Sequence, residues 1–356
     1  MRNRLRGGVK RNLTSIGVGA ALMVMASVFV PRAATAQTDR AAHRSPSVAK
    51  SNVPRTHDGH PDLQGVWSFA SATPLERSPQ FADKPVLTDA EAAAFLKNLP
   101  SGGCRFVKCD GSDQGKLESA YDDGWYEAGA KLAENRTSLI VDPPNGKIPA
   151  LTAEAQRRVA ELRALDPSRA FLDGPEQATL SDRCIIGFNS GPPMTPSAYN
   201  NNVQIFQLGS HLVVLNEMVH NARIVALDGR PRLPASMRLW VGDSRGRWEG
   251  DTLVVETTNF RRDSLVGPSG NTSISPESIR LIERFTRTSP DMLQYEYTMD
   301  DPRTWTRPWT VRIPMTRSAE HIYEYACHEG NYSMRNRLSA ARAADGKAPP
   351  QKNDPR

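Results

Sequence analysis

The sequence predicts a mainly β protein, in which an antiparallel β-meander closes into a barrel, a long mixed helix and loop region follows the first strand, and a helix ends the fold. The composition is that of a folded protein, with 38% hydrophobic and 24% charged residues. From residue 202 onward, runs rich in β-branched and aromatic residues alternate with turn residues. The expected strands cover residues 203–208, 211–217, 223–227, 237–241, 252–258, 279–286, 292–298, 309–314 and 322–326.

A short turn pattern recurs three times in this half of the chain. Residues 209–212, 250–253 and 290–293 each combine a two-residue turn with a strand whose second residue is leucine. Such a period also fits propeller blades, but a propeller needs at least about four blades and only three copies occur. We therefore expect successive hairpins of one antiparallel barrel.

The region before the meander is expected to hold the first strand and two helices. Residues 62–70 are rich in β-formers and predict the first strand. Thr88 and Glu91 have capping-box spacing and predict a helix over 87–99, and Thr152 caps a second expected helix over 152–165. The Gly- and Pro-rich stretch 101–149 predicts covering loops. The expected divisions are 59–201 for the first strand with this mixed region, 202–344 for the barrel with a terminal helix over 333–344, and 345–356 for a loose tail.

The first 36 residues have the pattern of an export signal. Five positive charges precede the apolar run 13–30, and Ala34 and Ala36 supply the small residues that a signal peptidase requires. We expect cleavage after Ala36, followed by a flexible leader over 37–58, and a periplasmic or secreted protein. The alternative is an uncleaved membrane anchor, because an apolar helix of this length could just span a bilayer. No later stretch is apolar enough to span a membrane.

The basic charge of the chain does not indicate a nucleic-acid partner. The formal net charge is +6, and residues 1–36 contain six Lys and Arg residues and no acidic residue. Removal of this segment leaves a net charge of 6 − 6 = 0. We therefore expect a small-molecule ligand or substrate and no nucleic acid.

Export makes the four cysteines candidates for disulfides. Cys104 and Cys109 lie in one Gly-flanked loop, whereas Cys184 and Cys327 lie far apart in the sequence. The simplest connectivity joins the two near cysteines and the two distant ones. A four-thiolate zinc site is the alternative, although such sites usually carry a close cysteine pair on both sides.

Four strings are similar to those of a large group of uncharacterised exported bacterial proteins. They are residues 61–67 (PDLQGVW), 199–202 (YNNN), 242–255 (GDSRGRWEGDTLVV) and 323–331 (YEYACHEGN). This resemblance implies export and one shared architecture, and it assigns no catalytic residue. More loosely, the Gly65-Val66-Trp67 start is similar to the first strand of lipocalin-like (calycin-like) barrels, which implies a lipocalin-like barrel here. The long region after the first strand departs from the compact lipocalin pattern and leaves the strand order open.

Polar residues on otherwise apolar strands are the candidates for a functional site. Glu217, His220 and Arg223 form the first set. An imidazole beside a carboxylate is suited to general base catalysis, whereas the alternative is a structural histidine at a strand end. Arg223 is an expected ligand-binding residue, and so is Asn201 in the 199–202 string.

The second set lies in residues 243–251. The stretches 243–246 and 249–251 are turn-type sequences and predict turns. Alternatively, Arg245 is suited to clamp an anion and Trp248 to stack on a ring, so both are candidate ligand-binding residues.

The third set, Glu324, His328 and Glu329, flanks Cys327. A disulfide at Cys327 would hold the backbone rigid, as a catalytic group requires. The candidate acid and base residues are Glu217, His220, His328 and Glu329. Alternatively, the two histidines and one of the glutamates would make a two-His, one-carboxylate metal site.

No nucleophile elbow, Walker loop or dinucleotide fingerprint occurs in the sequence, and we expect no cofactor. The sequence favours an exported barrel that binds an apolar, aromatic or sugar-like molecule. One alternative is a lyase, isomerase or hydrolase that uses the acid and base residues named above. The other is an envelope structural or interaction module.

Overall fold

The computed structural model describes residues 52–99, 131–165, 174–261, 275, 277–344 and 346. Its strands are β1 (Gly65–Ser68), β2 (Ile140–Asp142), β3 (Asn202–Gln207), β4 (His211–Asn216), β5 (Ala222–Ala226), β6 (Asp243–Glu249), β7 (Thr252–Thr258), β8 (Arg280–Ser289), β9 (Met292–Asp300) and β10 (Trp309–Ser318). Its α-helices are α1 (Asp89–Lys97), α3 (Ala153–Leu165) and α4 (Ser333–Ala344). Short 3-10 turns occupy Pro79–Phe81, Ala133–Asn135, Pro175–Gln177 and Met218–His220.

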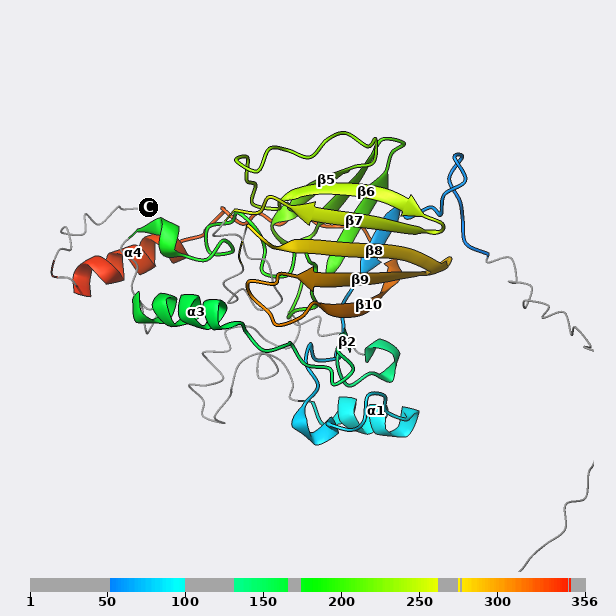
Figure 1. Ribbon diagram of the computed structural model, residues 1–356, viewed down its shortest axis with the longest axis horizontal. Coiled ribbons are helices and arrows are strands. Elements are labelled where there is room, and N and C mark those ends of the chain that lie inside the picture. The colour runs from blue at the N-terminus through cyan, green and yellow to red at the C-terminus, as the bar shows by residue number, and fades with distance from the viewer. Residues whose placement is uncertain are drawn as a thin grey trace, which may run out of the picture. The chain divides into compact units, whose positions relative to one another are not determined.

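The strands form a closed barrel (Figure 1). The order around it is β1-β3-β4-β5-β6-β7-β8-β9-β10, and β10 pairs back with β1. Trp67 of β1 lies opposite Val203 of β3 on one side and Arg317 of β10 on the other. The short strand β2 extends the sheet along β10 beyond β1. The predicted mainly β class, the barrel and the C-terminal helix are confirmed.

The barrel has two unlike ends. Tight turns join β3 to β4, β6 to β7 and β8 to β9 at one end, which we call the hairpin end. These turns are the three copies of the repeated pattern, so the predicted hairpins are confirmed. Longer connections gather at the opposite end, which we call the loop end. They include Met218–His220, residues 187–201 before β3 and residues 301–308 before β10.

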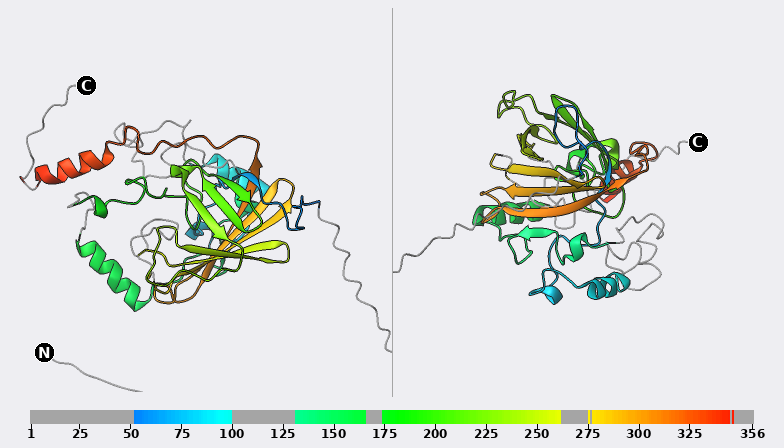
Figure 2. Two further views of the ribbon diagram at one scale, coloured as in Figure 1. Left: turned by 90° about the horizontal axis from the view of Figure 1, so that it is seen from above. Right: turned by 90° about the vertical axis from the view of Figure 1, so that its right-hand side faces the viewer.

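Alternation along the strands places an apolar face inside the barrel. On β9, Leu293, Tyr295, Tyr297 and Met299 are fully buried, and the residues between them are half-buried. β8 and β10 follow the same period of two. Figure 2 shows β3 to β5, in green, across the barrel from the yellow and orange strands β8 to β10. The side chains of both walls form one buried cluster, as expected for a small barrel filled by its own residues.

Trp67 closes the barrel at the hairpin end. Its Nε1 donates to the Leu63 carbonyl oxygen at 2.9 Å, and the guanidinium groups of Arg287 and Arg317 lie over its ring at 5.3 and 5.8 Å. Gln207 Oε1 accepts from the Leu63 amide at 2.7 Å. The buried Arg287 donates to the carbonyl oxygens of three residues. The polar groups of these side chains are therefore bonded within the fold.

The three helices begin within two residues of the predicted positions, at Asp89, Ala153 and Ser333. Thr88 and Glu91 form the capping box of α1, and the Thr152 hydroxyl accepts from the Ala155 amide at the start of α3. Lys84 foremost, then the Thr88 amide and hydroxyl, lower the pKa of Glu91 to about 2. Among the residues described, no helix is both long and apolar enough to cross a membrane.

Cys184 and Cys327 form a disulfide with a Cα–Cα distance of 5.7 Å, which confirms one predicted pairing. The bridge connects the segment before β3 to the chain after β10 and spans 143 residues of sequence. Cross-linking a loop of this length stabilises a fold by about 4 to 5 kcal/mol in the chain-entropy model. The predicted Cys104–Cys109 pair lies outside the described residues.

Two of the predicted strands are wrong. Residues 237–241 form no strand, because this stretch belongs to the connection between β5 and β6 and only Leu239 bridges a neighbour, Phe260. Residues 322–326 are extended without a strand partner. Their β-forming residues are not buried against the sheet, and Tyr323 is 71% exposed.

The turn predicted at 243–246 is also wrong, because these residues begin strand β6. Ser244 faces the interior, where its hydroxyl bonds Thr257 of β7 at 2.9 Å, and the register with β7 is continuous. The turn predicted at 249–251 is confirmed as the β6–β7 hairpin. The strands are also not all antiparallel, because β5 meets β6 in parallel through Ala226 and Arg245.

Candidate functional site

A buried charged network lies inside the barrel. Arg223 of β5 is 3% exposed and Glu283 of β8 is fully buried. The guanidinium holds the carboxylate with two hydrogen bonds, of which Nη2 to Oε1 is 2.9 Å. The Tyr295 hydroxyl of β9 donates to the same Oε1 at 2.7 Å. An ion pair is costly to bury and rarely adds stability over an apolar replacement, so this network indicates a role beyond packing.

The strands place these three side chains by alternation. Arg223 lies on the inward face of β5 between the exposed Ala222 and Ile224. Glu283 lies between the buried Leu281 and Phe285 in the inward row of β8. Sequence reasoning selected Arg223 but missed Glu283 and Tyr295. The sequence feature that could have identified Glu283 is its position as the lone acidic residue in an inward row that is otherwise largely apolar.

The pKa values of two members of the network, Arg223 and Tyr295, are raised. Burial opposes the charge of Arg223, but attraction to the Glu283 carboxylate and hydrogen bonding with it outweigh burial and raise the pKa of Arg223. Burial first, and the Glu283 charge second, raise the pKa of Tyr295 well above its usual value. Burial likewise raises the pKa of Tyr297. Both phenols therefore stay protonated and can donate hydrogen bonds at neutral pH.

An aromatic wall continues from this network toward the loop end. The ring centroids of Tyr295 and Tyr297 are 5.9 Å apart, those of Tyr297 and Trp309 are 6.2 Å apart, and Trp309 meets Trp305 edge-on at 5.4 Å. Phe285 lies on the other side of Tyr295 at 5.0 Å. All five rings are buried in the core, so they offer a stacking surface only to a ring that displaces a neighbouring side chain.

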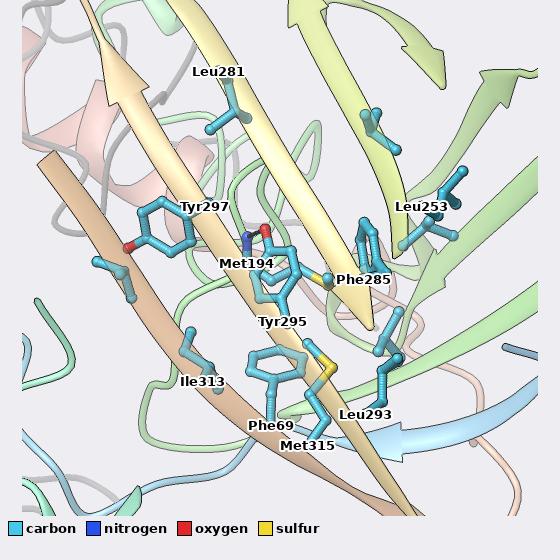
Figure 3. Packing of buried hydrophobic residues seen from close by; sticks show 14 of the residues in the cluster. Phe69, Met194, Leu253, Leu281, Phe285, Leu293, Tyr295, Tyr297, Ile313 and Met315 are labelled. Carbon is cyan, nitrogen blue, oxygen red and sulfur yellow. Dashed lines mark hydrogen bonds between the residues drawn. The ribbon is translucent and has the colours of Figure 1, made fainter. Parts of the chain in front are cut away.

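Residues 187–201, which we call the stopper segment, fill the loop end. Met194 is fully buried, and its amide donates to the Tyr295 hydroxyl oxygen at 3.2 Å. Figure 3 shows Met194 next to Tyr295, among the side chains of the barrel core. The Thr195 hydroxyl bonds the Tyr297 hydroxyl at 3.2 Å, and Ser190 donates to the Met218 carbonyl at 3.0 Å. The stopper segment therefore rests on the polar groups of the barrel interior.

Seven buried side-chain atoms of the described residues lack a hydrogen-bond partner, and four of these atoms belong to the loop end. The four are Asn189 Oδ1, Asn216 Oδ1, Asn221 Nδ2 and Trp309 Nε1, and the other three belong to Arg158, Arg245 and Gln294. Asn216 ends β4 and Trp309 begins β10, both at inward positions. Each buried group left unsatisfied costs about 1 to 3 kcal/mol, so such groups are usually paired. Their concentration at one end of the barrel identifies this end as the candidate site.

The structure brings four predicted site residues to the loop end. Arg223 lies in the charged network. Glu217 accepts from the Asn202 side chain at 2.8 Å. Asn201 is fully buried, and its amide group bonds the Ser197 main chain at 2.8 and 2.9 Å and so shapes the stopper segment.

His220, the fourth, contacts the chain after β10. Its Nε2 lies 2.6 Å from the Tyr323 carbonyl oxygen and 3.2 Å from the Tyr325 amide. A protonated Nε2 donates to the first and an unprotonated Nε2 accepts from the second. Val219 and His220 have left-handed φ values of 62° and 49°, which are uncommon for side-chain-bearing residues. His220 thus has backbone contacts, and its catalytic role stays a prediction.

The other predicted residues lie elsewhere. Arg245 is on the outer face of β6, where it pairs with Asp243 at 2.9 Å, and Trp248 stacks on His60 with a centroid distance of 4.5 Å. His328 and Glu329 are exposed in the chain that follows the last strand. His328 lines a cleft whose described lining residues include neither His220 nor Arg223. A metal site stays without support in the described residues, where no three His, Cys, Asp or Glu side chains gather to hold an ion.

The fold and this interior define a closed β-barrel protein, compatible with the lipocalin-like class. No protein-family model matches the chain, and no curated protein matches its sequence. The resemblance to exported bacterial proteins stays a prediction.

Proposed function

We propose that this protein binds a small organic molecule in the loop end of its barrel. The observation that carries the proposal is that four unpartnered buried polar atoms belong to the loop end of the barrel whose interior holds the Arg223–Glu283–Tyr295 network. If this end served only for packing, apolar groups in these positions would give a more stable fold, because each unpartnered buried atom lowers stability. A ligand that bonds them recovers this loss on binding.

The chemistry of these atoms favours an uncharged ligand with hydroxyl or amine groups. Asn189 and Asn216 each offer a carbonyl oxygen, and Trp309 offers an N–H donor. The Arg223 charge is already neutralised by Glu283. The aromatic wall supplies a stacking surface, so an aromatic or sugar-like molecule suits the site better than a fatty acid.

The stopper segment occupies the space that a ligand would take. Met194 has a flexible side chain that repacks at low cost, and its amide contacts the barrel through the Tyr295 hydroxyl. We propose that the ligand displaces Met194 and takes over this hydrogen bond. The Cys184–Cys327 bridge anchors the chain just before the stopper segment and limits how far it moves.

We also propose that the protein works outside the cytoplasm. The export pattern of residues 1–36 supports this location, and so does the disulfide, because disulfides persist in oxidising compartments.

Two buried asparagines provide a matched test of the binding site. The change Asn216→Leu removes the unpartnered carbonyl, and we expect the free energy of unfolding of the ligand-free protein to rise by about 1 kcal/mol. The same change at Asn201 removes bonded groups and should lower it by about 1 to 3 kcal/mol. Denaturant unfolding measures both values.

Ligand response separates function from stability. A panel of aromatic, sugar and fatty compounds is screened by the shift in melting temperature of the unmodified protein. A compound that stabilises it should fail to stabilise Asn216→Leu. If Asn216→Leu is less stable than the unmodified protein and keeps the full ligand shift, the proposed site is wrong.

A further inference from the structure

A cleft of about 390 Å³ lies on the surface beside the disulfide. Its walls come from the chain before β3 and the chain after β10. The lining residues are Pro175, Asp182, Arg183, Ile185, His328, Asn331 and Met334. The volume is within the range of small-ligand sites. None of these residues belongs to the barrel interior.

Arg183 and His328 face this cleft, and neither side chain has an acidic partner among the described residues. Arg183 contacts the Trp240 ring, with its guanidinium carbon 5.7 Å from the ring centroid, and forms no ion pair in the described part of the chain. The exposed His328 side chain has no hydrogen bond within the same residues. Asp182 is the acidic residue of the lining, and its carboxylate is paired with Arg337 at 2.5 Å. The cleft therefore has an excess of positive charge.

The disulfide holds these two side chains together. Arg183 directly precedes Cys184 and His328 directly follows Cys327, and the bridged Cα atoms are 5.7 Å apart. Asn331 adds a second tie, because its side-chain amide donates to the Asp182 carbonyl oxygen and to Cys184 Sγ, both at 3.2 Å. Donors held on a rigid support lose little entropy when they bind a ligand.

We propose that this cleft is a second binding site, for a small organic carboxylate with an apolar or aromatic body. The Arg183 guanidinium and the His328 imidazole bind the carboxylate oxygens, and Ile185, Met334 and Pro175 contact the body. A singly charged carboxylate suits the site better than a phosphate dianion, because Asp182 is balanced by Arg337 and the described lining then offers the one unbalanced charge of Arg183.

Titration with benzoate tests this site, with benzamide as the uncharged analogue and inorganic phosphate as the divalent anion. We expect benzoate to bind more tightly than either, as measured by calorimetry. The change Arg183→Gln should weaken benzoate binding about tenfold or more, since a charged hydrogen-bonding partner is lost. Arg183→Lys keeps the charge but loses the planar fork and should give an intermediate loss.

Controls distinguish a site from general attraction of anions. Arg335 is an exposed arginine of α4 that does not line the cleft, so Arg335→Gln makes the same charge change and should leave benzoate affinity unchanged. His328→Gln should weaken binding severalfold. Equal effects of Arg183→Gln and Arg335→Gln, or equal binding of benzoate and benzamide, would overturn the proposal.

The barrel site and the cleft give separable results. Loss of benzoate binding in Asn216→Leu, with no loss in Arg183→Gln, would mean that the acid enters the barrel and that the cleft is not a site. Loss in Arg183→Gln alone supports the cleft, whether or not the barrel binds a ligand.

Discussion

The hairpin end and the loop end of the barrel differ in the hydrogen bonding of their buried polar groups. At the hairpin end, Trp67 bonds a carbonyl oxygen, Gln207 bonds the neighbouring main chain, and Arg287 donates to three residues. At the loop end, four buried atoms lack a partner and an ion pair lies in the interior. Since both ends belong to one sheet, the sheet itself does not require the difference.

This contrast assigns different roles to the two ends. Apart from Gln294 Nε2, on β9 close to its turn, the hairpin end follows the rule that buried polar groups are bonded, and it stabilises the barrel. The loop end departs from that rule, and such departures gather where a protein binds or reacts. The backbone adds a second difference, because the loop end has a β-branched residue, Val219, at a positive φ in addition to the positive-φ glycines Gly191 and Gly242. At the hairpin end, Gly65 occupies such a position.

The largest expected effect comes from breaking the buried ion pair. Glu283→Leu leaves the Arg223 guanidinium buried without its partner and should lower the free energy of unfolding by about 3 to 5 kcal/mol. The double change Arg223→Met with Glu283→Leu removes both charges and should restore most of the lost stability. Denaturant unfolding of the two variants tests this expectation.

The same variants test whether the loop end serves binding and the hairpin end serves stability. The double variant should be stable but unable to bind ligands of the barrel. Trp67→Ala at the hairpin end should lower the free energy of unfolding by about 3 to 5 kcal/mol and leave ligand affinity unchanged in the folded fraction. A double variant as unstable as Glu283→Leu would mean that the ion pair serves stability, and the contrast would fail.

The sequence was sufficient to predict most of the barrel, because its strands alternate with a period of two and its hairpins repeat a turn pattern. It failed where an extended stretch has no strand partner, as at 237–241, and where glycine and aspartate suggested a turn inside β6. In both places the deciding factor was a neighbouring strand, which local propensity does not encode.

The candidate site was predicted only in part. Arg223 was selected because a charged residue on an apolar strand is unusual, but its partner Glu283 lies 60 residues away and meets it only after the barrel closes. The stopper segment was not predicted, because its Gly- and Pro-containing sequence resembles an ordinary loop, whereas Met194 lies in the core. His328 and His220 were expected to share a site, and the structure gives them different surroundings.

A pH titration tests whether the tyrosines of the loop end are buried in solution. The folded-state pKa values of Tyr295 and Tyr297 are raised above 10.0, so their contribution to stability is complete below pH 10 and is lost as the pH rises further. The unfolded chain then releases protons that the folded chain keeps. Each buried tyrosine should reduce the free energy of unfolding by about 1.4 kcal/mol per pH unit.

Phenolate absorbance follows this titration, and Tyr295 and Tyr297 should ionise only as the protein unfolds. The variants Tyr295→Phe and Tyr297→Phe identify the late groups. If neither variant removes a late-ionising group, the loop end is open to solvent, and the buried network that distinguishes it is absent in solution.

The smallest expected effect concerns the backbone at the two ends. Val219 has a φ of 62°, a conformation that costs a side-chain-bearing residue about 1 to 2 kcal/mol relative to glycine. Val219→Gly removes this cost and gives up part of the burial of a half-buried side chain, so we expect the free energy of unfolding to rise by up to about 1 kcal/mol. Gly65 has a φ of 126°, and an added Cβ would lie 3.4 Å from Arg317 Nη2, so space is available but the backbone is unfavourable. Gly65→Ala should therefore destabilise the protein by about 1 kcal/mol or more.

These two substitutions change the same kind of backbone position in opposite directions, and denaturant unfolding of both tests whether the loop end is strained. If the strain at Val219 serves the site, Val219→Gly should also weaken ligand binding, because it loosens the turn between Asn216 and Asn221 whose side chains contribute two of the unpartnered atoms. Gly65→Ala, at the far end of the barrel, should leave affinity unchanged. A stabilised Val219→Gly with full affinity would mean that the left-handed valine is tolerated and not used, and the contrast would then rest on the buried polar groups alone.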